Sequence, residues 1–160
     1  MMLRSLAQRV ARNPTVAKRA FSEAAKMSLS VTAPHEAICF QEPVESVTLP
    51  GAAGEYGVTA GHSPLVEELK PGVVAIVRAP GDAPEKYFVS GGFAFTDPEK
   101  TDVSVMEAIK LDDLDADKVK AEFAKAKATL DAATDDDAKA EATLALDALK
   151  TMATALNVTV

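Results

Sequence analysis

Residues 49–72 read LPGAAGEYGVTAGHSPLVEELKPG, where five glycines and three prolines separate short apolar pieces. Glycine permits positive φ angles and proline fixes φ, so the two residues at short intervals predict tight turns of defined shape. The residues expected to shape turns here, and in a second glycine-containing stretch near residue 90, are Pro50, Gly51, Gly54, Pro64, Pro71, Gly72, Gly91 and Gly92. We therefore expect short strands joined by rigid turns.

The same pattern extends on both sides, from residue 29 to residue 109. Short apolar pieces alternate with connectors that contain proline or glycine, such as Pro34, Pro43 and Pro98. This predicts an antiparallel β-sandwich or flattened barrel of about ten short strands. The run 73–77 is apolar at every position, which predicts a second sheet on one face and a further layer or a partner on the other. Strands are expected at 29–31, 37–40, 44–49, 56–58, 65–69, 73–78, 86–89, 93–96 and 103–108.

The composition changes after Lys110, because residues 112–156 contain no glycine or proline and are rich in alanine, lysine, aspartate and leucine. We expect two helices, at 114–132 and 138–156, with Asp112 and Asp113 capping the first and Asp135–Asp137 the second. The predicted fold is thus α+β, with a sandwich domain at 27–110 and an antiparallel helical hairpin at 111–160. One apolar seam on each helix would join the pair: Val119, Phe123, Ala126 and Leu130 on the first, and Leu146, Leu149, Met152 and Leu156 on the second.

The first 27 residues differ in charge from the rest. They hold six basic residues and one acid, a net charge of +5, which leaves −12 for the remainder of the chain's total of −7. A basic, acid-poor start with interspersed leucine and valine is typical of a mitochondrial transit peptide, expected at 1–22, and Arg19-Ala20-Phe21-Ser22 resembles a cleavage site. A disordered basic arm is the alternative.

Charge and hydropathy also exclude some partners. A remainder at −12 repels nucleic-acid phosphates and anionic lipid. The longest unbroken apolar run, 73–77, is far shorter than the roughly 20 residues of a membrane-spanning helix, so no direct membrane insertion is expected.

No catalytic residue, metal site or cofactor is predicted. The nucleophile-elbow pattern fails because Leu65 stands where a second glycine is needed, and no phosphate-binding Walker loop is present. His62 is interpreted as a residue that bonds neighbouring backbone and fixes the Gly61 turn, with a general base as the alternative. The single cysteine, Cys39, is interpreted as a small buried hydrophobe.

Five blocks carry a family resemblance: Leu49-Pro50-Gly51, Gly54-Glu55-Tyr56-Gly57-Val58, Ala60-Gly61-His62-Ser63-Pro64-Leu65, Leu69-Lys70-Pro71-Gly72 and Phe88-Val89-Ser90-Gly91-Gly92-Phe93. They resemble the central-stalk subunits of F-type ATP synthases, called delta in mitochondria and epsilon in bacteria and chloroplasts. The resemblance implies a non-catalytic rotor subunit on the matrix side of the mitochondrial inner membrane. The implied partners are the gamma subunit, the ring of proteolipid c subunits and the small mitochondrial epsilon subunit. Residues implied to lie in or near one loop that faces the ring are Glu55, Tyr56, Gly57, Ala60, Gly61 and His62.

Two other functions remain as alternatives. Some bacterial relatives bind ATP on the hairpin through an Ile/Leu-Asp-x-x-Arg-Ala pattern, whereas the matching positions here run from Leu114 to Val119 and contain no arginine. Lysine does not reproduce the bidentate arginine fork on phosphate, so nucleotide sensing is the weaker reading. A sandwich enzyme or carbohydrate binder would need an open cleft with converging polar groups.

Overall fold

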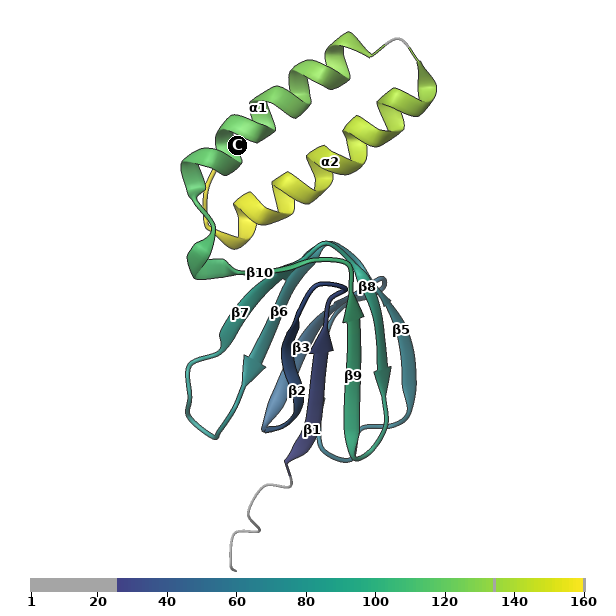
Figure 1. The fold of residues 1–160 in the computed structure, drawn as a ribbon, viewed down its shortest axis with the longest axis vertical. Coiled ribbons are helices and arrows are strands. Elements are labelled where there is room, and N and C mark those ends of the chain that lie inside the picture. Colours follow the sequence, from purple (N-terminus) through teal and green to yellow (C-terminus); the bar gives the residue numbers. More distant parts are fainter. Residues whose placement is uncertain (1–25, 134, 160) are drawn as a thin grey trace, which may run out of the picture.

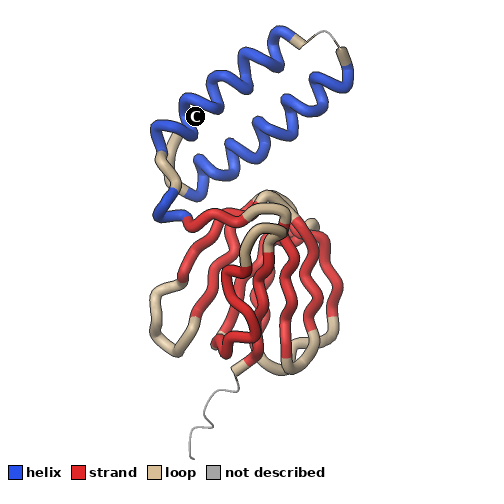
Figure 2. Tube along the Cα trace, viewed as in Figure 1, coloured by secondary structure: helices blue, strands red, loops and turns tan. Residues whose placement is uncertain are grey.

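The computed structural model describes residues 26–133 and 135–159, so the predicted transit peptide at 1–22 lies outside the described residues. Ten strands are followed by two helices, which is the predicted α+β fold (Figures 1 and 2). The strands are β1 (Met27–Thr32), β2 (Ala37–Val44), β3 (Ser46–Gly51), β4 (Gly54–Thr59), β5 (Leu65–Leu69), β6 (Gly72–Val77), β7 (Glu85–Val89), β8 (Gly92–Thr96), β9 (Lys100–Val105) and β10 (Ala108–Lys110).

The strands hydrogen-bond in the order β10-β7-β6-β3-β5-β8-β9-β1-β2, and β4 pairs with β3 off this path. Strand β3 is the corner of the sandwich. Its first half pairs with β6, and its last residue, Gly51, pairs with Leu69 of β5. Every pair is antiparallel except β1–β9, which is parallel. The sequence did not indicate this pair, since β1 and β9 lie at opposite ends of the sandwich sequence and no hairpin sets their direction.

The core forms because alternate side chains of each strand point between the two layers. Leu29 and Val31 of β1, Val74 and Ile76 of β6, and Val103 of β9 are almost completely buried. Val73 borders a groove under the second helix, which contacts β6. The further layer predicted over the run 73–77 is therefore supplied at this end by the chain itself.

Three predicted boundaries in the sandwich are wrong. Pro43 was expected in a connector but lies in β2 opposite Ser28, where an edge strand tolerates a missing N–H. The strand expected at 44–49 is interrupted at Glu45, whose N–H donates to the carbonyl of Val77 at 2.9 Å. The strand expected at 103–108 divides into β9 and β10, because the chain crosses there from the partner β8 to the partner β7.

The helical hairpin follows β10 through a short 3-10 turn, η1 (Leu111–Asp113). Its helices are α1 (Ala116–Ala132) and α2 (Asp136–Ala155). The predicted start at residue 114 and the predicted caps Asp112 and Asp113 are wrong, since both aspartates belong to η1. Asp115 is the cap, and its carboxylate accepts hydrogen bonds from the N–H groups of Asp117 and Lys118.

The hairpin stands at one end of the sandwich, next to the point where β10 leads into η1 (Figure 1). It touches the sandwich through α2 on β6 and through η1 on β7. No helix among the described residues combines the length and the apolar character needed to cross a membrane.

Candidate docking surfaces

Of the residues expected in one ring-facing loop, Glu55, Tyr56 and Gly57 lie in β4, whereas Ala60, Gly61 and His62 follow the end of that strand. Glu55 is exposed near the start of β4, beside a groove of about 430 Å³ that also borders Lys150 and Thr154 of α2. Gly61 lies beyond the other end of β4, where its N–H donates to the carbonyl of Pro98. Because β4 is six residues long, these ends are separated by roughly 17 Å. Glu55 and Gly61 therefore lie at opposite ends of β4 and not in one continuous loop, and the contact of these residues with the ring stays a prediction.

His62 nevertheless lies beside the same groove as the first residues of β4. Its side chain borders a groove of about 320 Å³ together with Glu55, Tyr56 and Glu67. Its N–H donates to the carbonyl of Thr59, and Nδ1 lies 2.8 Å from the carbonyl oxygen of the adjacent Ser63. These bonds agree with the interpretation that His62 fixes the turn at Gly61, whose φ is +80°.

Tyr56 links this groove to the interior of the fold. Its ring lies against Gly51, where a Cβ atom would be 3.0 Å from Tyr56 Cε1. Burial, and secondarily the charge of Glu67, raises the pKa of Tyr56 above its ordinary value. The Tyr56 hydroxyl is buried and has no hydrogen-bond partner in residues 26–133 and 135–159.

Several of the predicted turn residues lie close together at one end of the sandwich. Gly72 packs so closely that a Cβ atom there would be 2.5 Å from Cβ of Pro50. The carbonyl of Pro50 accepts a hydrogen bond from the N–H of Lys70, beside Pro71. Gly91 lies immediately before β8 and Gly92 is its first residue. Pro64 lies immediately before β5, at the other end of that strand from Leu69. Gly54 opens β4 after the two-residue turn that follows Gly51.

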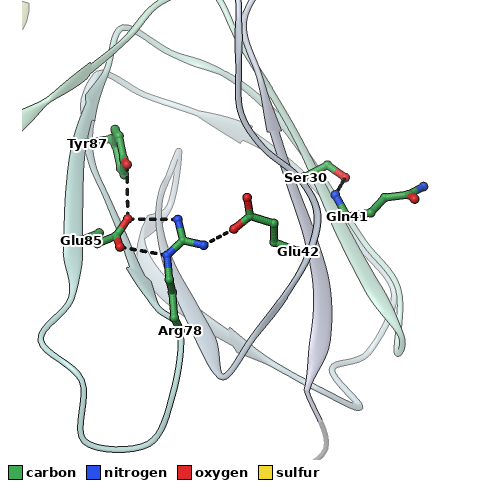
Figure 3. Close-up of polar contacts among 6 residues, drawn as sticks. All are labelled: Ser30, Gln41, Glu42, Arg78, Glu85 and Tyr87. Atoms are coloured by element: carbon green, nitrogen blue, oxygen red, sulfur yellow. Dashed lines mark hydrogen bonds and ion pairs between the residues drawn. The ribbon is translucent and has the colours of Figure 1, made fainter.

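A polar cluster that the sequence did not indicate ties edge strand β2 to β6 and β7 (Figure 3). Arg78 donates from Nε and Nη2 to both carboxylate oxygens of Glu85 and from Nη1 to Glu42. The Tyr87 hydroxyl also donates to Glu85. The hydrogen bonds from Arg78 lower the pKa of Glu85 below its ordinary value. Arg78 and Glu85 are seven residues apart, on either side of the turn that joins β6 to β7. Glu42 is 36 residues from Arg78 and meets it only when the sandwich closes.

The outer face of the β5-β8-β9-β1-β2 layer exposes apolar side chains. Phe40, Val66, Phe93 and Phe95 are each at least half exposed. Between Phe40 and Phe95 lies a groove of about 910 Å³ floored by hydroxyl residues of β1 and β9, including Ser30, whose Oγ accepts the N–H of Gln41. Phe93 and Phe95 share one face of β8, because alternate residues of a strand point the same way, but this alternation does not tell whether the face is inside or outside.

The hairpin is joined along a narrow apolar seam. Among the predicted seam residues Val119 is buried, as is the nearby Ala142 of α2, and the other predicted residues are partly buried: Phe123, Ala126, Leu130, Leu146, Leu149, Met152 and Leu156. Ala153 is completely buried but was not predicted, because alanine occurs throughout both helices and gives little contrast in a pattern.

No group of three or more His, Cys, Asp or Glu side chains in the described part of the chain could hold a metal ion. Cys39 lies in the core, where burial raises the pKa of its thiol, in agreement with its interpretation as a buried hydrophobe.

Comparison with known proteins identifies the family. The model of the "ATP synthase, Delta/Epsilon chain, beta-sandwich domain" matches residues 26–111. The chain is 39% identical over 159 residues to mitochondrial ATP synthase subunit delta of Pichia angusta, with 97% of both chains covered. It is 40% identical over 133 residues to the mitochondrial ATP synthase F(1) complex subunit delta of Dictyostelium discoideum, covering 82% of this chain and 78% of the relative.

A solved structure is similar as well. One chain in the cryo-EM structure of the Euglena gracilis mitochondrial ATP synthase, OSCP/F1/c-ring in rotational state 1, superposes with a TM-score of 0.76. It is 31% identical, and 82% of each chain is covered. Because the family model spans more than half of the sequence and the Pichia angusta relative aligns along nearly all of it, the chain belongs to the ATP synthase delta/epsilon family.

Proposed function

We propose that the chain is a rotor subunit of the central stalk of the mitochondrial F-type ATP synthase. It links the gamma shaft to the ring of proteolipid c subunits and couples proton transport to ATP synthesis. It works as a peripheral protein on the matrix side of the inner membrane. The observation that carries this proposal is the similarity to a mitochondrial delta subunit along 97% of the chain, sandwich and hairpin included.

The role is mechanical and not catalytic. Transmission of torque requires a body that does not deform, and this sandwich has one continuous core whose corner is held by close contact between Pro50 and Gly72. Stable interfaces of this kind commonly bury on the order of 2,000 Å² or more, so a subunit that is always bound exposes apolar surface when it is alone. The exposed aromatic face around Phe93 and Phe95 fits that expectation.

We assign two surfaces to two partners. Strand β4 and the turn that follows it, which together contain Glu55, Tyr56, Gly57, Ala60, Gly61 and His62, face the polar loops of the c ring. The aromatic face with Phe40, Val66, Phe93 and Phe95 packs on the gamma subunit. The hairpin contributes contacts to gamma and to the small epsilon subunit. Polar groups along β4 suit polar loops, whereas desolvated aromatic side chains suit a permanent protein interface.

Nucleotide sensing is disfavoured by the local chemistry of the hairpin. The aspartate at the family's nucleotide-binding position, Asp115, accepts two backbone hydrogen bonds as the cap of α1. Lys118 occupies the position that is arginine in the nucleotide-binding pattern. Its single ammonium group cannot make the two parallel hydrogen bonds to phosphate that a planar guanidinium group makes. Titration of the isolated chain with ATP is expected to give no saturable binding at cellular concentrations.

The decisive experiment is affinity purification of the full chain, tagged at its C-terminus, from mitochondria of cells that lack the native gene product. We expect gamma and subunit c to co-purify in constant proportion, and depletion of the chain to reduce proton-coupled ATP synthesis. Purification without either subunit, or turnover of a substrate by the isolated chain, would contradict the proposal.

A further inference from the structure

Strand β2 is held weakly at the outer edge of its sheet. It is one of the two end strands of the sheet order, and the other end strand, β10, lies across a groove from it. This groove of about 430 Å³ is bordered by Ile38 of β2, Tyr87 of β7 and Ile109 of β10. In the described part of the chain, β1 is the only element whose backbone runs alongside β2. The sandwich is therefore open along the outer edge of β2.

The pairing of β2 with β1 is itself irregular. The register shifts twice between Leu29 and Thr32. Gln41 has a φ angle of +51°, a region that residues with a Cβ atom rarely adopt, and its N–H donates to the side chain of Ser30. Pro43 has no N–H to contribute to the ladder. These interruptions leave β2 with fewer main-chain bonds than a regular strand of its length.

Few side chains of β2 are buried. Of its eight residues only Cys39 and Val44 are buried, and Val44 is the last of them. The next residue, Glu45, donates its N–H to the carbonyl of Val77, so this end of β2 is fixed to β6. The segment 37–42 buries Cys39 alone. Because resistance to local opening follows the apolar contacts that a segment buries, 37–42 is expected to open more readily than the interior strands.

One ion pair holds the outer side of this segment. Figure 3 shows Glu42 and Glu85 on opposite sides of the Arg78 guanidinium group. Nη1 of Arg78 donates to Glu42, and within residues 26–133 and 135–159 no other ion pair includes a residue of β2. Two hydrogen bonds to Glu85 keep the guanidinium group in place from the β7 side. Glu42 is therefore the member of the cluster whose loss frees β2.

The segment 37–42 covers a thiol and carries an aromatic side chain. Cys39 is only 3% exposed, burial raises the pKa of its thiol, and the nearby carboxylates of Glu42 and Glu85 act in the same direction. Phe40 is exposed on the aromatic face described above. Opening of this segment would uncover the thiol and remove Phe40 from that face.

We propose that the segment 37–42 is a strap that opens while the other strands stay folded, and that the ion pair of Glu42 with Arg78 controls how often it opens. The strap stays attached through the turn at 33–36 and at the buried Val44. Release of the strained angle at Gln41 favours opening, and the ion pair opposes it. This device belongs to the chain itself and does not depend on the proposed stalk function.

Alkylation of Cys39, the single cysteine, measures the opening in the isolated full chain. Iodoacetamide forms a thioether with an exposed thiolate and releases iodide, and mass spectrometry follows the product. We expect Cys39 to react in low urea through an opening that depends less on urea concentration than global unfolding followed by circular dichroism. If Cys39 reacted only with the free energy and urea dependence of global unfolding, the proposal would be refuted.

Two matched variants test the ion pair. Glu42→Gln removes the bond from Arg78, while Asp102→Asn removes the exposed pair with Lys100 and changes the charge equally. Each labelling rate is divided by the rate of the same variant unfolded in urea, which corrects for changes in thiol reactivity. We expect the corrected rate to rise about two- to fivefold in Glu42→Gln and to stay at the wild-type value in Asp102→Asn. Equal corrected rates in the two variants would overturn the role of the ion pair.

Hydrogen exchange of the wild-type chain tests the strap without a thiol reagent or a mutation. We expect the amides of 37–42 that bond to β1 to exchange at least about tenfold faster than those of the interior strand β9. Equal protection of the two sets would contradict the strap.

Discussion

At the scale of single residues, close packing and special backbone angles decide what each turn tolerates. Gly61 lies at φ +80°, a region that residues with a Cβ atom rarely adopt. Gly72 has no positive φ angle, but any side chain at this position would collide with Pro50. The two glycines of one family pattern therefore have different physical reasons.

The backbone angle at Gly61 leads to the first prediction. Gly61→Val is expected to lower the free energy of unfolding by about 1–3 kcal/mol, because a β-branched residue is strained at positive φ. Gly61→Asn is the control and should lose less, since asparagine tolerates this region better. Urea unfolding of the isolated chain measures both. Identical midpoints for wild type and Gly61→Val would show that the positive angle is not required.

The pair of Arg78 and Glu85 leads to a prediction about pH. Arg78 lowers the pKa of Glu85 in the folded state. The pair therefore stabilises the fold fully at pH values above 4.5, the ordinary pKa of this carboxyl group. The stabilisation is lost as the pH falls through the lower pKa that Glu85 has in the folded protein. Both side chains are more than a third exposed, so solvent screening limits the effect to less than about 1 kcal/mol.

Arg78→Gln should therefore reduce stability at pH 7 and flatten the decline of stability below pH 4.5. Lys100→Gln, which breaks the more exposed pair with Asp102, is the control of equal charge change and should alter the profile less. Urea unfolding from pH 7 to pH 3 checks this. A parallel decline in Arg78→Gln and wild type would contradict the assignment of Glu85.

At the scale of elements, helix starts depend on single capping groups that composition does not distinguish. The segment from Asp112 to Asp117 offers four aspartates, and only Asp115 accepts the N–H groups of the first turn of α1. The sequence pattern alone does not distinguish which of the four aspartates caps the helix. The observed choice follows from where η1 ends and the chain turns to begin the helix.

Removal of this cap gives the third prediction. Asp115→Ala should destabilise α1 by about 1 kcal/mol, because two backbone donors lose their acceptor. Asp112→Ala is the control and should have little effect. Faster hydrogen exchange confined to the first turns of α1 would support the assignment, and equal exchange in the two variants would contradict it.

At the scale of the whole molecule, the sandwich and the hairpin differ in how much they bury. The cluster of buried residues in the sandwich contains fifteen side chains, whereas within the described hairpin only Val119, Ala142 and Ala153 are buried. Since stability follows buried apolar area and is not uniform across a chain, the two parts should open at different free energies.

The fourth prediction follows from this difference. In the isolated chain, amides of α1 and α2 should exchange faster than those of β1, β3 and β9, by at least about tenfold, with the end of α2 on β6 the slowest part of the hairpin. Native-state hydrogen exchange at several urea concentrations measures this. If the amides of the helices and of the strands exchanged in a single cooperative step, the prediction would be wrong. The contact of α2 with β6 would then stabilise the hairpin as much as the core stabilises the strands.

Local chemistry was sufficient for the sequence to indicate the class of fold, the short strands, the shaped turns and the helical pair, because proline, glycine and apolar periodicity act within a few residues. Interactions between distant residues were decided only by the tertiary structure. These include the parallel pairing of β1 with β9 and the ion pair of Arg78 with Glu42 of the edge strand β2. Each depends on which strand edges meet when the sandwich closes, and nothing in a local pattern specifies that.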